Sequence, residues 1–232
     1  MEGVYPEKSL FEFIQLVVMT AVVLKPMKTS FIAAVAISGC LAVSALIEAQ
    51  RAPPTVDFRP VSNSQNWIVK EPLIYEVGIS HDSVTVPRGF VTDFATIPPI
   101  LQSLIQQNGP HLLPAVIHDY LYWKQSCTRD QADQIFLLAM MENKVSAAER
   151  TAMYQAVRAA GELAWTSNAR ERAAGLIRIL PENRLQVPTL TTWPDYRQGL
   201  LKMAVADGPS ATIAAAFCQR GSMSIEQALQ TP

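Results

Sequence analysis

The sequence predicts an α+β protein, in which a small antiparallel β-sheet is followed by a mainly helical domain with an antiparallel helix hairpin, and a hydrophobic N-terminal helix precedes both. Three observations predict this fold. Residues 10–47 are strongly apolar, residues 67–86 hold short β-branched and aromatic runs, and helical patterns with capping residues follow from residue 111. We expect four parts: a hydrophobic membrane or signal segment at 1–50, a linker at 51–66, a core domain at 67–166 and a helical extension at 167–232.

The composition excludes several classes of protein. Of the 232 residues, 49% are hydrophobic and 17% are charged, and the net charge is −1. This balance argues against a disordered chain, and no strong positive field exists to bind nucleic acid. Three cysteines are too few for a disulfide framework, and the lack of a C-x-x-C pair excludes a zinc ribbon or a thioredoxin-type centre. The absence of GxSxG, HExxH and P-loop motifs removes the commonest hydrolase and NTPase routes.

The first fifty residues predict a membrane or export segment. Leu10–Leu24 is mostly apolar, and Phe31–Ile47 carries no charge. A helix of the second length spans roughly 25 Å, near the lower limit for crossing a bilayer. Cys40 follows Ile-Ser-Gly, a sequence that looks like the lipobox of bacterial lipoproteins.

Three fates of this segment stay open: an uncleaved anchor, cleavage after Ala49, and lipidation of Cys40. The start codon is equally open between Met1 and Met27, because Met27 begins a short basic stretch before the second apolar run. In each case we expect the remainder of the chain to lie outside the cytoplasm, and the leading expectation is a membrane-anchored protein that faces the periplasm or the exterior.

The strands are expected directly after the Pro-rich linker. The runs at 67–70, 73–79 and 83–86 predict one small antiparallel sheet, and Ser80-His81-Asp82 supplies a turn that makes the last two runs a hairpin. We expect His81 in this turn and His111 at a helix start to be solvated surface residues.

The helices are expected from residue 98 onward. A short helix at 98–107 precedes a longer one at 111–125. Thr128 with Gln131, and Ser146 with Glu149, predict capping boxes that begin two further helices. These helices are expected to end near residues 143 and 165, and weaker helical segments follow at about 194–205, 210–219 and 224–229.

The candidate site lies in the helix hairpin around residues 125–127. His118 and Asp133 are equally far from the bend, roughly 11 Å along each helix. Side chains that face each other on helices ~8–10 Å apart can hydrogen-bond. The spacing therefore predicts a His118–Asp133 dyad in which one imidazole nitrogen faces the carboxylate and the other acts as a general base. Tyr122 is expected opposite Arg129, one turn nearer the bend.

Further ionisable residues surround the dyad. Asp119 is rotated ~100° from His118 around the helix, so it is expected to bind a metal ion or to hold a loop. Asp93 follows a strand and is interpreted as an N-cap or a metal ligand. Arg158 is expected to pair with Asp130 or Asp133 in a structural role. Ionisable groups clustered among apolar helices favour function, because buried charge is costly unless it is paired or used.

The chain resembles the domain-of-unknown-function family thirteen fifty-three, which occurs in phages and bacteria and has no assigned reaction. The resemblance covers about residues 67–165. It is carried by VPRGFVTDFATIP at 86–98, HDYLY at 118–122, Ala132-Asp133-x-x-Phe136 and the later Tyr154, Arg158, Gly161 and Trp165.

A helix with His-Asp-x-x-Tyr before a helix with Asp-x-x-Phe is also similar to the secreted phospholipase A-two superfamily. This resemblance implies that His118 activates water, Asp119 binds calcium, Tyr122 supports the site and Asp133 orients His118. The glycine-rich calcium loop of those enzymes is missing, so the segment from Asp93 to Pro98 would have to supply other ligands. Their inter-helix disulfides are also missing, and Cys127 and Cys218 offer at most one bridge.

These observations lead to a functional hypothesis with rivals. We expect an envelope-located hydrolase with a His118–Asp133 dyad and Tyr122, assisted by calcium on Asp119 and Asp93, and acting on a phospholipid ester before a cell-wall substrate. The first rival is a non-enzymatic, membrane-anchored or phage-derived structural protein in which the same residues form a buried polar brace. The second is a metal-dependent enzyme that uses Asp93, His118 and Asp119.

Overall fold

The structure is a computed structural model, and it describes residues 57–61, 65–94 and 109–232. The predicted N-terminal hydrophobic helix and the helix predicted at 98–107 lie outside these residues. Within them, no helix combines the length and the apolar character needed to cross a bilayer. The α+β class and the antiparallel pairing of the strands are confirmed.

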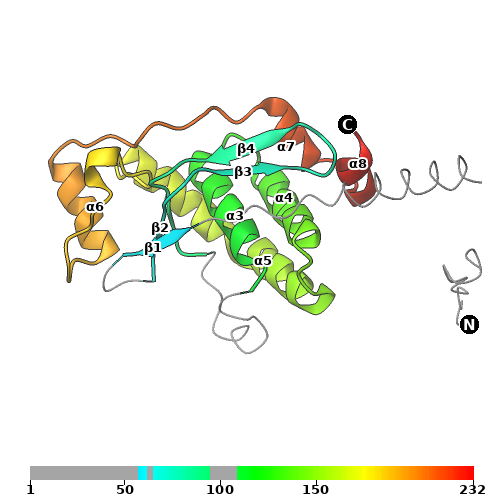
Figure 1. The fold of residues 1–232 in the computed structure, drawn as a ribbon, viewed down its shortest axis with the longest axis horizontal. Helices are drawn as coiled ribbons and strands as arrows, with labels where there is room; N and C mark the ends of the chain where they lie inside the picture. Colours follow the sequence, from blue (N-terminus) through cyan, green and yellow to red (C-terminus); the bar gives the residue numbers. More distant parts are fainter. Residues whose placement is uncertain (1–56, 62–64, 95–108) are drawn as a thin grey trace, which may run out of the picture. The chain divides into compact units, whose positions relative to one another are not determined.

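In the described part of the chain, the strands form two small antiparallel sheets instead of the single sheet that we predicted (Figure 1). The first has the order β1-β2-β5, and the second is the predicted hairpin β3–β4. The strands are β1 (Phe58–Pro60), β2 (Trp67–Val69), β3 (Leu73–Glu76), β4 (Ser83–Val86) and β5 (Val91–Thr92). Part of the predicted linker thus forms β1, and β5 places Asp93 directly after a sheet.

Three long helices build the centre of the domain, and α3 and α4 lie side by side (Figure 1). The helices are α3 (Leu112–Lys124), α4 (Arg129–Glu142), α5 (Ala147–Ala173), α6 (Trp193–Lys202), α7 (Ala215–Arg220) and α8 (Ile225–Gln230), with a 3-10 turn η2 (Glu182–Arg184). The prediction that α5 ends near Trp165 is wrong, because the helix continues for two more turns through polar residues.

The turn between α3 and α4 is set by local sequence. Gln125 ends α3 in the left-handed conformation (φ 52°), and its N–H donates to the carbonyl of Leu121. Thr128 then caps α4 by accepting from the N–H of Gln131, whose side chain accepts from the N–H of Thr128. This reciprocal capping box was predicted, and it fixes where the α3–α4 hairpin turns.

Helix α3 is enclosed on all sides, since every residue from Pro114 to Trp123 is buried. It contacts α4, α5 and the strands β4 and β5. Any ionisable side chain on α3 must therefore be neutral, paired or hydrogen-bonded.

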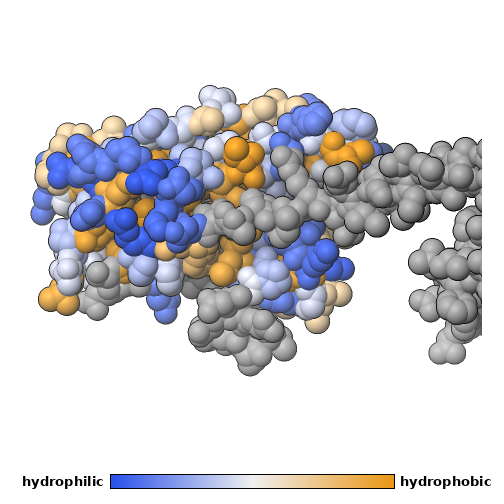
Figure 2. Space-filling model, in the orientation of Figure 1, coloured by the Kyte–Doolittle hydropathy of each residue, from blue (hydrophilic) through white to orange (hydrophobic). Residues whose placement is uncertain are grey.

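The exposed hydrophobic side chains are scattered. On the face shown in Figure 2, hydrophobic areas are separated by hydrophilic ones. The large exposed hydrophobic residues of the described chain are two in the β3–β4 hairpin, one on α5 and two outside the long helices: Ile74, Ile79, Leu163, Leu190 and Met203.

The C-terminal segment is attached to the hairpin by a disulfide between Cys127, at the α3–α4 turn, and Cys218 on α7. Next to it, Gly221 approaches the main chain of α4 so closely that an added Cβ would lie 2.4 Å from the carbonyl oxygen of Gln131. The buried Arg220 donates to Asp82 at 2.6 Å in the β3–β4 turn. The segment thus ties the hairpin β3–β4 to the start of α4.

Removing this disulfide is expected to lower the free energy of unfolding by about 2–4 kcal/mol, because the bond closes a long loop and limits the unfolded chain. The sequence separation of the two cysteines is 91 residues. The test is urea unfolding of a Cys127→Ala/Cys218→Ala variant, with reduced wild type as the control. An unchanged midpoint would show that the C-terminal segment packs equally well without the bond.

Candidate active site

The predicted contact between His118 and Asp133 is present. Nε2 of His118 on α3 lies 3.0 Å from Oδ1 of Asp133 on α4. Both residues are buried, with 3% of His118 and none of Asp133 exposed. The hairpin register therefore brings the two groups together as the sequence predicted.

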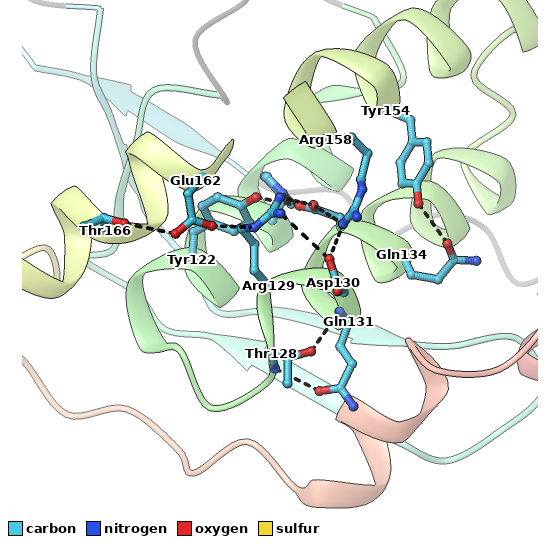
Figure 3. Close-up of polar contacts among 12 residues, drawn as sticks. Tyr122, Thr128, Arg129, Asp130, Gln131, Gln134, Tyr154, Arg158, Glu162 and Thr166 are labelled. Carbon is cyan, nitrogen blue, oxygen red and sulfur yellow. Dashed lines mark hydrogen bonds and ion pairs between the residues drawn. The ribbon is translucent and has the colours of Figure 1, made fainter. Parts of the chain in front are cut away.

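Asp133 has three further partners, Tyr122, Arg129 and Arg158, which are labelled in Figure 3. The hydroxyl of Tyr122 donates to Oδ1 at 2.6 Å. Arg129 and Arg158 each place Nη1 near Oδ2, at 3.1 and 3.0 Å. Burial alone would raise the pKa of Asp133, but the hydrogen bonds from His118 and Tyr122 and the bond from Arg158 outweigh it and lower that pKa. The carboxylate is therefore ionised and acts only as an acceptor.

The imidazole of His118 packs between two rings. Its centroid is 4.1 Å from that of Tyr122 and 4.7 Å from that of Phe136. Burial lowers the pKa of His118, and the hydrogen bond to Asp133 offsets this only in part, so the ring is neutral near pH 7. Since an ionised carboxylate cannot donate, we assign the ring hydrogen to Nε2 and the lone pair to Nδ1. Among the described residues, none hydrogen-bonds to Nδ1.

Tyr122 is held by α5 on its far side. Its ring meets Trp165 edge-on at 5.1 Å between centroids. Gly161 faces the hydroxyl so closely that a Cβ there would lie 2.3 Å from Oη. The absence of a side chain at this position lets Tyr122 reach Asp133.

The Gly161→Ala variant is expected to be destabilised by about 1–2 kcal/mol, although alanine favours a helix by about 1 kcal/mol, because the methyl group displaces a buried hydroxyl. Gly199→Ala in α6 is the matched control, since no atom lies within 4 Å of its added Cβ, and it is expected to stabilise by about 0.5–1 kcal/mol. Thermal unfolding of both variants measures this difference. Shifts of the same sign would contradict the proposed contact between Gly161 and Tyr122.

Asp93 and Asp119 form a second acidic group beside the dyad. Oδ2 of Asp119 accepts from Oγ1 of Thr92 at 2.5 Å. Burial and the neighbouring charge of Asp93 raise the pKa of Asp119 to about 7, and the two carboxyl groups share a hydrogen bond. Nη2 of Arg178 lies 3.4 Å from Oδ1 of Asp93, which balances part of the charge.

The phospholipase resemblance implies that Asp93 and Asp119 bind calcium. Calcium takes roughly six to eight oxygen ligands. The described residues supply two carboxylates, which are bonded to each other, to Thr92 and to the guanidinium of Arg178. Within the described ranges no cluster of three or more His, Cys, Asp or Glu side chains is placed to hold an ion. The described donor set alone does not fit calcium, and we route no chemical step through a metal.

The prediction for His111 is wrong, whereas His81 is exposed as expected. His111 is fully buried, and its Nδ1 lies 3.0 Å from Oε1 of Glu149. The predicted capping box of Ser146 and Glu149 forms only in part, because Ser146 accepts from the N–H of Glu149 but no reciprocal bond from the Glu149 side chain is present. The side chain of Glu149 turns instead to the start of α3.

Sequence reasoning missed Arg178, which donates to the carbonyl of Val91 at 2.9 Å and faces Asp93. It lies in a loop 85 residues beyond that carboxylate, and main-chain pairing that includes the bridge between Phe90 and Ile179 brings it to the site. No local pattern could indicate that pairing.

Most of the site lies in a part of the chain that matches a known protein family. Residues 67–157 match a family described as protein of unknown function (DUF1353). The match includes Asp93, the His118–Asp133 dyad and Tyr122, and it ends one residue before Arg158. Comparisons with curated proteins and with solved structures gave no match. The DUF1353 match confirms the family resemblance predicted from the motifs, over residues 67–157.

Proposed function

We propose that this domain is a hydrolase in which His118, oriented by Asp133, acts as a general base toward water. The observation that carries the proposal is the 3.0 Å contact between Nε2 and a fully buried, ionised carboxylate. It leaves the lone pair of a neutral imidazole on Nδ1, and a neutral imidazole is the form that accepts a proton near pH 7.

The reaction follows from this assignment. Nδ1 takes a proton from water as the oxygen attacks an ester carbonyl, and Asp133 stabilises the imidazolium that forms. When the tetrahedral intermediate collapses, the imidazolium returns the proton to the departing alcohol. The products are an acid and an alcohol, and the enzyme regains its starting state.

We propose an envelope substrate, a phospholipid ester before a peptidoglycan bond. The hydrophobic N-terminal sequence favours export. The Cys127–Cys218 disulfide supports the same location, because such bonds persist in oxidising compartments outside the cytoplasm. The similarity of the His-Asp helix pair to secreted phospholipases favours the lipid.

A second candidate is a non-enzymatic protein in which the same residues brace the fold. The observation that favours it is the ring of His118, which is only 3% exposed between Tyr122 and Phe136. Asp133 also receives bonds from α3, α4 and α5, as a structural brace would.

The deciding experiment is a hydrolysis assay of the purified full chain on phosphatidylglycerol vesicles and on cell-wall fragments. Product release by wild type that His118→Ala abolishes would support the enzyme. An inactive wild type, or a variant as active as wild type, would favour the brace. Parallel assays with calcium and with a chelator test the calcium requirement, which stays a prediction.

A further inference from the structure

Two guanidinium groups bind the oxygen of Asp133 that the dyad does not use. Oδ1 faces His118 and Tyr122, whereas Oδ2 faces Arg129 on α4 and Arg158 on α5. The side chains of the two arginines are 21% and 35% exposed, and Asp133 is not exposed at all. Arg129 also pairs with Glu162 and Arg158 with Asp130, as Figure 3 shows.

The protonation state of Asp133 decides which nitrogen of His118 is basic. An ionised carboxylate accepts from Nε2–H, so the lone pair lies on Nδ1. A protonated carboxyl would donate to Nε2 instead, and the ring would then carry its hydrogen on Nδ1. Burial alone favours the protonated form, so the charge of the carboxylate needs compensation.

Arginine is suited to supply this compensation, because its guanidinium is always charged in proteins. The exposed partners Asp130 and Glu162, with side chains 73% and 69% exposed, are largely solvated and take up little of the arginine charge. Bonds to both oxygens of Asp133 also prevent rotation of the carboxylate. The two arginines thus supply both positive charge near the Asp133 carboxylate and hydrogen bonds that hold its Oδ2 in place.

We propose that Arg158, together with Arg129, is a positioning residue of the dyad: the two guanidinium groups hold Asp133 ionised with Oδ1 toward Nε2, and so set the tautomer of His118. The catalytic meaning of this role rests on the function proposed above. Neither arginine contacts the reacting nitrogen, and Arg158 lies just outside the family match.

The test is the tautomer itself, measured without substrate. The chain has three histidines, so the ring nitrogens of His118 can be assigned in ¹⁵N-histidine-labelled protein by comparison with His81→Gln and His118→Gln. At a fixed pH at which the His118 ring is neutral, wild type is expected to carry the ring hydrogen on Nε2 and none on Nδ1. The Arg129→Gln/Arg158→Gln variant is expected to lose or reverse this difference.

Single variants keep the test usable if the double variant does not fold. Arg158→Gln, which retains Arg129, is expected to bring the ¹⁵N chemical shifts of the two ring nitrogens of His118 partly toward each other. Arg158→Lys is expected to restore the wild-type spectrum. The matched control is Arg150→Gln on the same helix, since Arg150 donates to the carbonyl of Val145 and not to the dyad. If the ¹⁵N spectrum of His118 is the same as in wild type both in Arg158→Gln and in a folded double variant, the proposal is overturned.

Kinetics separate this proposal from the proposed function. On phosphatidylglycerol vesicles, kcat of the double variant is expected to fall on the order of 100-fold with KM unchanged, at the lower end of what a general base contributes. If wild type hydrolyses none of the substrates but the arginine variants change the ¹⁵N spectrum of the His118 ring, the positioning contact is supported and the proposed hydrolase activity is not. An unchanged kcat beside a changed tautomer would refute the positioning role.

Discussion

The His118→Gln variant is expected to lose about 100- to 10,000-fold in kcat for ester hydrolysis, the range that a positioned general base contributes. Glutamine carries an amide N–H that can still donate to Asp133, so it keeps the polar contact but has no group that accepts a proton near neutral pH. The expected change in melting temperature is therefore only a few degrees. The measurements are initial rates on phosphatidylglycerol vesicles and a thermal melt of the same samples.

The matched control is His81→Gln in the β3–β4 turn, where the histidine is exposed and should affect neither measurement. If His118→Gln hydrolyses lipid as fast as wild type, the dyad has no catalytic role. If wild type is inactive and His118→Ala is much less stable than His118→Gln, the polar contact serves as a brace.

The Asp133→Ala variant is expected to lose about 3–5 kcal/mol of unfolding free energy, which lowers the melting temperature by roughly 6–20 °C. The carboxylate is fully buried and accepts from four side chains on three helices: His118, Tyr122, Arg129 and Arg158. Removing it leaves these donors without their shared acceptor, which costs far more than losing a surface contact. Circular dichroism during heating measures the loss.

Asp130→Ala is the control for this prediction, because Asp130 pairs with the same Arg158 at the surface, where its side chain is 73% exposed. An exposed pair contributes about 0–1 kcal/mol, so this variant should melt close to wild type. Equal losses in the two variants would mean that burial of the Asp133 carboxylate is not the source of its stabilising effect.

Local sequence signals predicted the helical hairpin well. The Thr128–Gln131 capping box is encoded within a few residues, so the positions of the bend and of the facing side chains follow from counting. This is why the His118–Asp133 contact could be predicted. The role of the contact in catalysis stays a prediction.

Features that depend on distant partners were not predictable in the same way. Strands β1 and β5 are two or three residues long and form only because β2 lies between them. His111 looked like a surface residue because the side chain that covers it, Glu149, belongs to another helix. In both cases tertiary packing overrides the local pattern, and counting along neighbouring residues does not show which distant segments will pack together.

The C-terminal packing matters for any attempt to truncate this protein. A fragment limited to the family match would stop in the middle of α5 and would lack Phe217, which is fully buried in the main core. It would also uncover Trp123, whose indole N–H donates to Asp207 and whose ring lies under Arg172 and Arg197. Such a fragment is expected to aggregate on expression, so a shortened protein for assay or crystallisation should retain α6, α7 and α8.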